Sequence, residues 1–203
     1  NNPLQAVVGY SELLRASGKM SEESQQDVDR IYDAGQRAAR IVRNLLTFAR
    51  KHDRQKEEID LNQSISSVLN LLTNQLETMH VATVANLGDD LPSCYADRHQ
   101  LQQVWHNLIL NAEQAMLKAH DGGVLAIRSF LKDVDTLRVE FTDDGPGIPK
   151  KIMGRIFDPF FTTKKVGEGT GLGLSGVEKQ VLKKDIKIWA ESANGNGSTF
   201  VIE

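Results

Sequence analysis

Two asparagines in the second half of the chain, Asn107 and Asn111, have the residue type and spacing of ligands for a hard cation. They lie four positions apart in a segment with helical periodicity, so both side chains should project from one helix face. Amide oxygens can ligate Mg²⁺ while phosphate oxygens supply its other ligands. The simpler interpretation of such a pair is polar helix surface, so the assignment needs support from the rest of the chain.

A carboxylate followed by glycines, in residues 143–148 (DDGPGI), comes at the end of a predicted strand. Asp143, just past that strand, could accept a hydrogen bond from a ligand while the glycines let the chain turn tightly beneath it. Taken alone, the same pattern also fits a simple turn.

Residues 157–164 (FDPFFTTK) place three phenylalanines within five positions and end on Lys164. Phenylalanines at this density are hard to explain as solvent-exposed, so we expect the rings to be covered. Lys164 beside them could reach a phosphate as a point charge. The alternative interpretation is a small satellite core under the loop.

A glycine-rich stretch, residues 167–174 (GEGTGLGL), comes directly before an apolar helical segment. Backbone N–H groups at the start of a helix form an anion site, and glycine lets a phosphate come close to the backbone. A flexible surface loop is the alternative for a glycine cluster by itself.

A mixed α/β region is predicted to position these four groups. Hydrophobic periodicity predicts helices over 61–79, 97–118 and 171–182, and strands over 81–87, 124–131, 137–141, 186–191 and 198–202. Because the helices do not alternate strictly with the strands, a mixed sheet covered on one face is favoured over a doubly wound sheet.

The first quarter of the chain has a different pattern, which predicts a helical hairpin over 3–16 and 22–51 with Ser21 as an N-cap. In the first helix, Leu4, Val8 and Leu14 face one way. In the second, apolar or small residues alternate spacings of four and three, as in the seam of a packed helix pair. These residues are Ile31, Gly35, Ala38, Val42, Leu45 and Ala49.

A two-helix hairpin buries too little surface alone, so we expect two copies to form a four-helix bundle. A coiled linker, or a hairpin packed on its own domain, is the alternative. The charged stretch 51–58 (KHDRQKEE) is predicted to be a solvated connection to the second region.

The bulk composition excludes several classes of protein. With 24 basic and 27 acidic residues the net charge is −3, which argues against a nucleic-acid-binding surface. The single cysteine, Cys94, excludes an internal disulfide and fits a reducing compartment. No apolar run approaches the roughly 18 residues that would span a bilayer, and no signal peptide is recognisable.

The chain begins without a methionine and in the middle of a pattern. We therefore interpret it as a fragment, expect it to be cytoplasmic, and expect any membrane anchor to lie outside it.

Together and in this order, the four groups resemble the sequence boxes of sensor histidine kinases, whose ATP-binding domain is of the Bergerat (GHKL) type. Residues 107–112 match the N box, 143–147 the G1 box, 157–164 the F box and 169–174 the G2 box. Residues 1–4 (NNPL) match the tail of the phosphoacceptor motif, H-E-[IL]-N-N-P-L. The resemblance implies an α+β chain: a hairpin (1–56) that forms a four-helix bundle on dimerisation, then a Bergerat-type α/β sandwich with a mixed sheet (57–203).

The resemblance also implies binding of ATP and Mg²⁺. Asn111 would ligate the metal with support from Asn107, and Asp143 would accept a hydrogen bond from the adenine amino group. Residues 149–166 would form a mobile lid over the nucleotide, and Lys164 would contact phosphates. The other residues implied to contact the nucleotide are Gly145, Gly147, Ile148, Gly169, Thr170, Gly171, Leu172, Gly173, Leu174 and, near the adenine, Thr199.

The implied reaction is transfer of the γ-phosphate to a histidine and then to an aspartate on the receiver domain of a response regulator. Related hydrolases place a glutamate at the position of Asn107 as general base. Because an asparagine cannot take a proton at neutral pH, a kinase is favoured over an ATPase. A pseudokinase that binds nucleotide as a scaffold is the other alternative.

The phosphoacceptor histidine would stand three residues before Asn1, and none of the five histidines has the motif around it. We therefore expect this fragment to bind ATP without phosphorylating itself. Asn2, four residues after the phosphoacceptor, is implied to orient the water that dephosphorylates the regulator. The alternative is that Asn2 only starts a helix before Pro3. Asn2, Asn107 and Lys164 are thus the catalytic residues that the resemblance implies.

Overall fold

A computed structural model describes residues 2–17, 20–49, 56–164, 170–181, 186–192 and 195–203. The chain divides into two compact units, residues 1–52 with 160–172 and residues 53–159 with 173–203. We describe each unit by itself, and the predicted domain boundary after residue 56 stays a prediction. Over the described ranges, none of the helices combines the length and the apolar character that a bilayer crossing requires.

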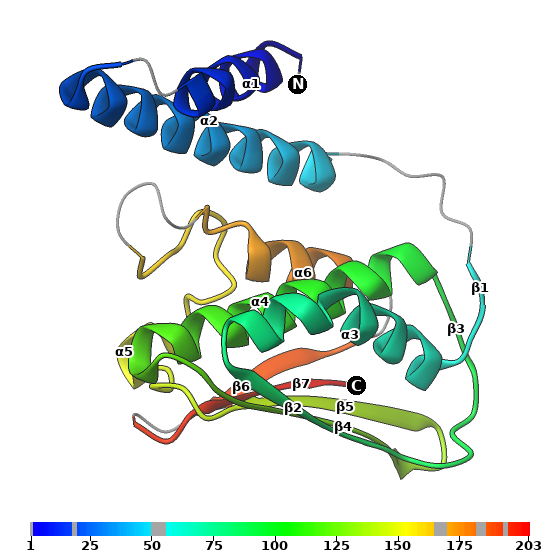
Figure 1. The fold of residues 1–203 in the computed structure, drawn as a ribbon. Helices are drawn as coiled ribbons and strands as arrows, with labels where there is room; N and C mark the ends of the chain where they lie inside the picture. Colours follow the sequence, from blue (N-terminus) through cyan, green and yellow to red (C-terminus); the bar gives the residue numbers. More distant parts are fainter. Residues whose placement is uncertain (1, 18–19, 50–55, 165–169, 182–185, 193–194) are drawn as a thin grey trace. The chain divides into compact units, whose positions relative to one another are not determined.

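The first unit contains the predicted helical hairpin. Its helices are α1 (Asn2–Ser17) and α2 (Glu22–Ala49), which run side by side in opposite directions (Figure 1). Ser21 caps α2 as expected, because its hydroxyl accepts from the Ser24 N–H at 3.3 Å and its carbonyl from the Gln25 N–H at 2.9 Å. Two acids, Glu22 and Glu23, occupy the first turn, where their negative charge interacts favourably with the positive end of the helix dipole.

Among the described side chains, an ion pair and a close approach join the two hairpin helices. Arg15 Nε lies 2.8 Å from Asp29 Oδ1. A Cβ on Gly35 would come within 2.9 Å of Val8 Cγ2, so glycine here allows the helices to approach closely. Among the hairpin side chains that the structure describes, five large apolar ones remain exposed in the single chain: Val7, Tyr10, Leu13, Leu14 and Ile31.

The exposed residues correct the prediction for the first helix, because Leu14 does not share the half-buried environment of Leu4 and Val8. In the second helix Gly35 is buried, and Ile31 is exposed in the single chain, where the predicted seam expects a second copy to cover it. The side chains of Leu45 and Ala49 lie outside the described residues.

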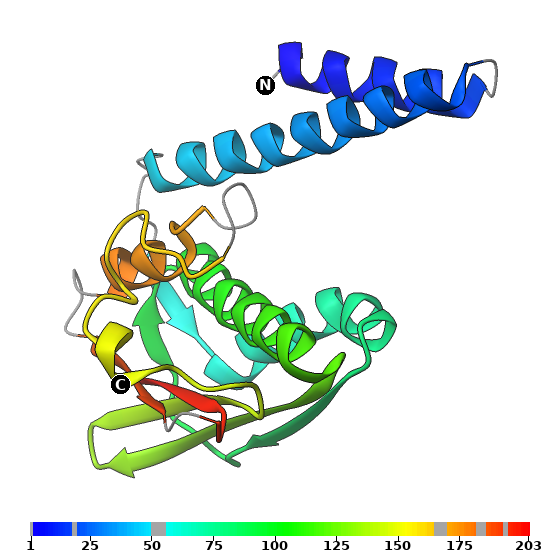
Figure 2. The same ribbon diagram turned by 90° about the vertical axis from the view of Figure 1, so that its left-hand side faces the viewer.

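The second unit is built on a mixed five-stranded sheet, which confirms the predicted architecture. Its strands are β2 (Val81–Leu87), β4 (Gly123–Asp133), β5 (Thr136–Asp143), β6 (Ile188–Ser192) and β7 (Ser198–Ile202), in the order β2-β4-β5-β7-β6. The β2–β4 pair is parallel and the other pairs are antiparallel. Helices α3 (Leu61–Thr78), α4 (Arg98–His120) and α6 (Gly173–Val181) cover one face (Figures 1 and 2).

The core lies between this sheet face and the helices. Residues Val139, Phe141 and Asp143 alternate along β5 and are all buried. Trp105 of α4 stacks on Phe141, with ring centroids 5.5 Å apart. Asp97 fixes the start of α4, because its carboxylate accepts from the Gln100 N–H at 3.1 Å.

Three short elements escaped sequence prediction. Strands β1 (Glu57–Ile59) and β3 (Cys94–Ala96) form a separate two-stranded sheet, and α5 (Lys150–Met153) is a single turn. Glu57 and Glu58 were expected in the solvated connection; their side chains are exposed, but their backbones pair with β3. Strands of three residues depend on partners far away in the chain, so local pattern does not reveal them.

Candidate functional site

Asp143 lies at the end of β5 and is 3% exposed. β5 runs past its predicted end at 141 because both neighbouring strands continue: Asp143 pairs with Leu125 of β4 and Ser198 of β7. Its Oδ2 accepts from the Ser198 hydroxyl at 2.6 Å and its Oδ1 from the Gly145 N–H at 3.0 Å. Burial raises the pKa of this carboxyl, and these hydrogen bonds act against that shift. The result is an acceptor oriented in advance.

The turn after Asp143 passes close to the carboxylate and to α4. A Cβ on Gly145 would lie 2.8 Å from Asp143 Oδ1 and 3.4 Å from Ala115 Cβ of α4, so a side chain at 145 would collide with the carboxylate. Gly147 has φ = 72°, which glycine adopts without strain. Both glycines therefore lie where the sequence placed them, next to the candidate acceptor.

Ser192 of β6 and the loop between β6 and β7 hydrogen-bond to the turn that follows Asp143. The Gly195 N–H donates to the Pro146 carbonyl at 2.8 Å, and the Ile148 N–H donates to the Ser192 hydroxyl at 2.7 Å. Ser192 Oγ in turn donates to the Gly197 carbonyl at 2.7 Å. Sequence reasoning missed these residues, although the glycines of the NGNGST stretch could have indicated a close approach of the backbone.

Asn107 and Asn111 project from one face of α4 toward the first residue of α6, as their spacing predicted. Asn107 Nδ2 donates to the Gly173 carbonyl at 3.5 Å, and a Cβ on Gly173 would lie 3.8 Å from both amide atoms of Asn111. Among the residues that the structure describes, Asn111 Nδ2 is a buried atom without a hydrogen-bond partner. Since an unsatisfied buried amide costs about 1–3 kcal/mol, a ligand that supplied a partner here would be favoured.

The donor set around Asn111 fits a magnesium ion that is shared with phosphates. Over the described part of the chain, no three His, Cys, Asp or Glu side chains gather in a way that could hold a metal. For a cation at this place, the Asn111 amide oxygen and oxygens of the bound nucleotide are the candidate ligands. Mg²⁺ is commonly bound in this way, with few protein ligands and several from substrate phosphates.

The glycine-rich stretch continues into α6, which begins at Gly173 and not at the predicted residue 171. Gly171 has φ = 61°, which a right-handed helix does not allow. The N–H groups in the first turn of an α-helix have no partner within the helix, and such groups can bind an anion. Val177, fully buried, and the half-buried Leu174 hold α6 in the second unit.

The remaining residues predicted to contact phosphates belong to the first unit or lie outside the described residues. Lys164, Thr170, Gly171 and Leu172 are in the first unit, and Gly169 is not described. Within that unit the Phe160 N–H donates to the Gly171 carbonyl at 2.9 Å. A contact between these residues and a nucleotide stays a prediction.

The phenylalanine cluster only partly follows its prediction. Phe157 packs edge-on against Phe200 of β7, with centroids 6.5 Å apart. Phe160 is 69% exposed, so the expectation that all three rings are covered was wrong for this residue. Phe160 has φ = 66°, and its N–H donates to the Gly171 carbonyl.

Ser198, and not Thr199, contacts Asp143, so the placement of Thr199 near a bound adenine stays a prediction. Ser198 is the partner of Asp143 across the β5–β7 ladder, whereas Thr199 pairs with Thr142. The Thr199 and Thr142 hydroxyls are 3.0 Å apart. Because successive strand residues point to opposite faces, Thr199 faces away from the Asp143 carboxylate, and we add Ser198 to the candidate site.

We therefore expect Ser198→Ala to weaken nucleotide binding by about fivefold, since Asp143 loses one of the hydrogen bonds that orient it. Thr199→Val, the matched control, should leave the dissociation constant unchanged. Isothermal titration calorimetry on both variants checks this. A larger loss of affinity in Thr199→Val than in Ser198→Ala would restore the original assignment.

Two known families match this chain. Residues 96–203 match the family described as "Histidine kinase-, DNA gyrase B-, and HSP90-like ATPase", and residues 1–54 match the "His Kinase A (phospho-acceptor) domain". The sensor kinase CckA of Brucella abortus is 36% identical over 214 residues, which cover 100% of this chain and 22% of that protein. The signal transduction histidine-protein kinase AtoS of Escherichia coli is 31% identical, over 99% of this chain and 32% of that protein. The chain thus spans about a third or less of the length of these two curated relatives.

Solved structures agree with the fold. Histidine kinase ThkA in complex with the response regulator protein TrrA has a TM-score of 0.68 at 26% identity and covers 99% of this chain and 57% of that chain. Full-length ShkA in complex with AMPPNP has a TM-score of 0.78 over 99% of this chain and 42% of that chain. At 23% identity, ShkA supports the fold alone.

Proposed function

Because this chain belongs to the sensor histidine kinases of two-component systems, we propose that it is the catalytic core of such a kinase. It binds ATP with Mg²⁺ and transfers the γ-phosphate to a histidine, from which the phosphate passes to an aspartate of a response regulator. The observation that carries the proposal is the amide pair Asn107 and Asn111, which faces the start of α6.

In this proposal the second unit recognises both ends of the nucleotide. Asp143 accepts from the adenine amino group, and glycine at 145 keeps a side chain from colliding with this carboxylate. Asn111 holds Mg²⁺, which neutralises phosphate charge when bound. Gly173 and the following N–H groups face the phosphates at the start of α6.

The chemistry of Asn107 favours a kinase over a hydrolase. An amide can orient an atom through a hydrogen bond but cannot remove a proton from water at neutral pH. Phosphoryl transfer depends mainly on positioning and charge neutralisation, which amides, backbone N–H groups and a metal supply. An ATPase and a nucleotide-binding scaffold remain the alternative functions.

The exposed apolar side chains of the hairpin favour a homodimer. Val7, Tyr10 and Leu13 of α1, together with Ile31 of α2, form more exposed apolar surface than a stable two-helix element normally keeps. A second hairpin would cover them in a four-helix bundle. The proposed regulator partner is supported by ThkA, a relative whose solved complex contains a response regulator. Both ATP and a receiver domain would be met in the cytoplasm, where we expect this chain to act.

The function is tested with the full-length protein, labelled ATP and Mg²⁺. A kinase yields a phosphoprotein whose label is lost in acid and retained in base, as a phosphohistidine requires. An ATPase releases phosphate without a labelled protein, and a scaffold binds ATP with neither product. Either of these last two outcomes would contradict the proposal.

Asn2 is proposed to orient the water that removes phosphate from the regulator. It begins α1, and an amide oxygen can accept from a water without taking its proton. In the full-length protein, Asn2→Ala should leave autophosphorylation near normal and prolong the lifetime of the phospho-regulator about 10- to 1000-fold. Equal lifetimes with the wild type and the variant would leave Asn2 only the role of a helix-start residue.

A further inference from the structure

The end of α4 lies directly against the turn that carries the candidate acceptor. His120 is the last residue of α4, and its Nε2 is 3.0 Å from the Asp144 carbonyl oxygen and 4.0 Å from Asp144 Oδ1. The chain then reverses through Asp121, with φ = 55°, and two glycines with positive φ, and enters β4. His120 thereby joins the helix that carries both site asparagines to the residue next to Asp143.

The start of β4 also contacts Asp144, through the carboxylate of this residue. The Val124 N–H donates to Asp144 Oδ1 at 3.0 Å. A Cβ on Gly123 would lie 2.3 Å from Asp144 Oδ1 and 2.8 Å from Met116 Sδ, so any residue larger than glycine would push Asp144 away. Asp144 is therefore held through its carbonyl by α4 and through its carboxylate by β4.

We propose that His120 and Asp144 are positioning residues. They hold the turn 143–148 in a fixed position against the end of α4 and thereby determine the preference for adenine over other bases. This inference rests on the proposed nucleotide site. The Asp144 carbonyl belongs to the peptide bond whose N–H, on Gly145, donates to Asp143 Oδ1. A contact that fixes this carbonyl also fixes the donor that orients the Asp143 carboxylate.

The inference predicts a pH dependence with a definite sign. The hydrogen bond to the Asp144 carbonyl raises the pKa of His120 above its ordinary value of 6.5, with smaller contributions from the Gly122 backbone and the Asp144 charge, while desolvation acts against the shift. An interaction that raises the pKa of a histidine is complete below the ordinary pKa and is lost as pH rises through the raised value. Adenine affinity should therefore fall as His120 loses its proton.

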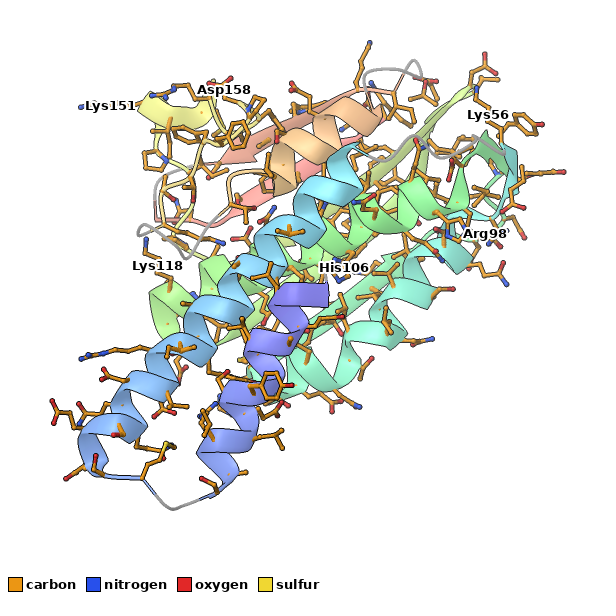
Figure 3. All side chains as sticks on the ribbon, turned by 90° about the horizontal axis from the view of Figure 1, so that it is seen from above. Lys56, Arg98, His106, Lys118, Lys151 and Asp158 are labelled. Carbon is orange, nitrogen blue, oxygen red and sulfur yellow. The ribbon has the colours of Figure 1, made fainter. Side chains whose placement is uncertain are left out.

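Few other polar or charged groups among the described residues lie near the contact between His120 and Asp144. Lys118 and Asp121 lie at the same end of α4, and Figure 3 shows Lys118 at the end of this helix opposite Arg98. His80, in the turn between α3 and β2, accepts from the Gly123 N–H through its carbonyl at 3.1 Å. Asp144 is the carboxylate whose charge contributes to the His120 shift.

The test compares calorimetric dissociation constants for Mg-ATP, Mg-GTP and inorganic triphosphate with the full-length protein. His120→Ala should weaken ATP binding about fivefold, the effect of one lost hydrogen bond, and leave triphosphate binding unchanged. His120→Gln keeps a donor and should recover part of the affinity. In the wild type the ratio of ATP to triphosphate affinity should fall between about pH 6 and 8, and in His120→Gln it should not change with pH.

The control is Lys118→Ala, which removes a charge from the same helix end and should preserve both the ratio and its pH profile. Equal weakening of ATP and triphosphate by His120→Ala, or a wild-type pH profile in this variant, would overturn the inference. If the wild type bound no ATP at all, the proposed function itself would fail, which is a distinct result.

Discussion

Asn111→Ala is expected to lower the rate of phosphoryl transfer about a thousandfold, the order of effect seen when one positioned electrostatic group is removed from a transition state. The physical reason is that Asn111 supplies the one protein amide that is buried, lacks a hydrogen-bond partner among the described residues, and faces the start of α6. Without it, the metal would keep only its nucleotide and water ligands and would no longer be fixed to α4.

A binding measurement separates this effect from general damage. In the wild type, calorimetry should show that Mg²⁺ increases the affinity for ATP, and in Asn111→Ala this increase should disappear. Asn74→Ala makes the same substitution at an exposed position of α3 and serves as the control. An unchanged Mg²⁺ effect in Asn111→Ala would remove this residue from the metal site.

Asp143→Asn is expected to weaken ATP binding by at least about 100-fold and to remove the preference for ATP over GTP. A site that is built to hydrogen-bond one group discriminates strongly, because its buried partner is otherwise left unpaired. The carboxylate of Asp143 presents acceptors alone, whereas an asparagine amide can present its donor to the adenine amino group. Calorimetry with both nucleotides measures the two affinities.

Asp89→Asn, an exposed change of the same chemistry, is the matched control. Burial is the largest cause of the raised pKa of Asp143, so the neutral amide avoids the cost of a buried charge and should not lower the melting temperature. A folded Asp143→Asn variant that still prefers ATP would contradict the assignment.

In the wild type, ATP affinity should also decline as pH falls through the raised pKa of Asp143, because the ionised acceptor is then lost.

Several parts of the fold could be predicted because they depend on local pattern. The helices α3 and α4 and the strands β2 and β7 lie within two residues of their predicted bounds. The spacing of Asn107 and Asn111 put both amides on one face, since the α-helix has a nearly constant periodicity. The glycines at 145 and 147 likewise followed from the backbone geometry of a tight turn.

The parts that could not be predicted depend on which segments meet. Strands β1 and β3 exist only as partners of each other, and their sequences are separated by α3 and β2. Phe160 was expected to be covered, but it is exposed and has a left-handed backbone conformation. No periodicity in the sequence reports either feature.

The sequence by itself determined the order of the elements, the mixed sheet, the helix-borne amide pair and the carboxylate at a strand end, because each follows from the local geometry of a helix, strand or turn. Only the tertiary structure decided that Ser198 and not Thr199 meets Asp143, since a shift of one residue in strand register moves a side chain to the opposite face of a sheet. It also decided that His120 meets Asp144, because that contact depends on where a helix end lies relative to a strand end.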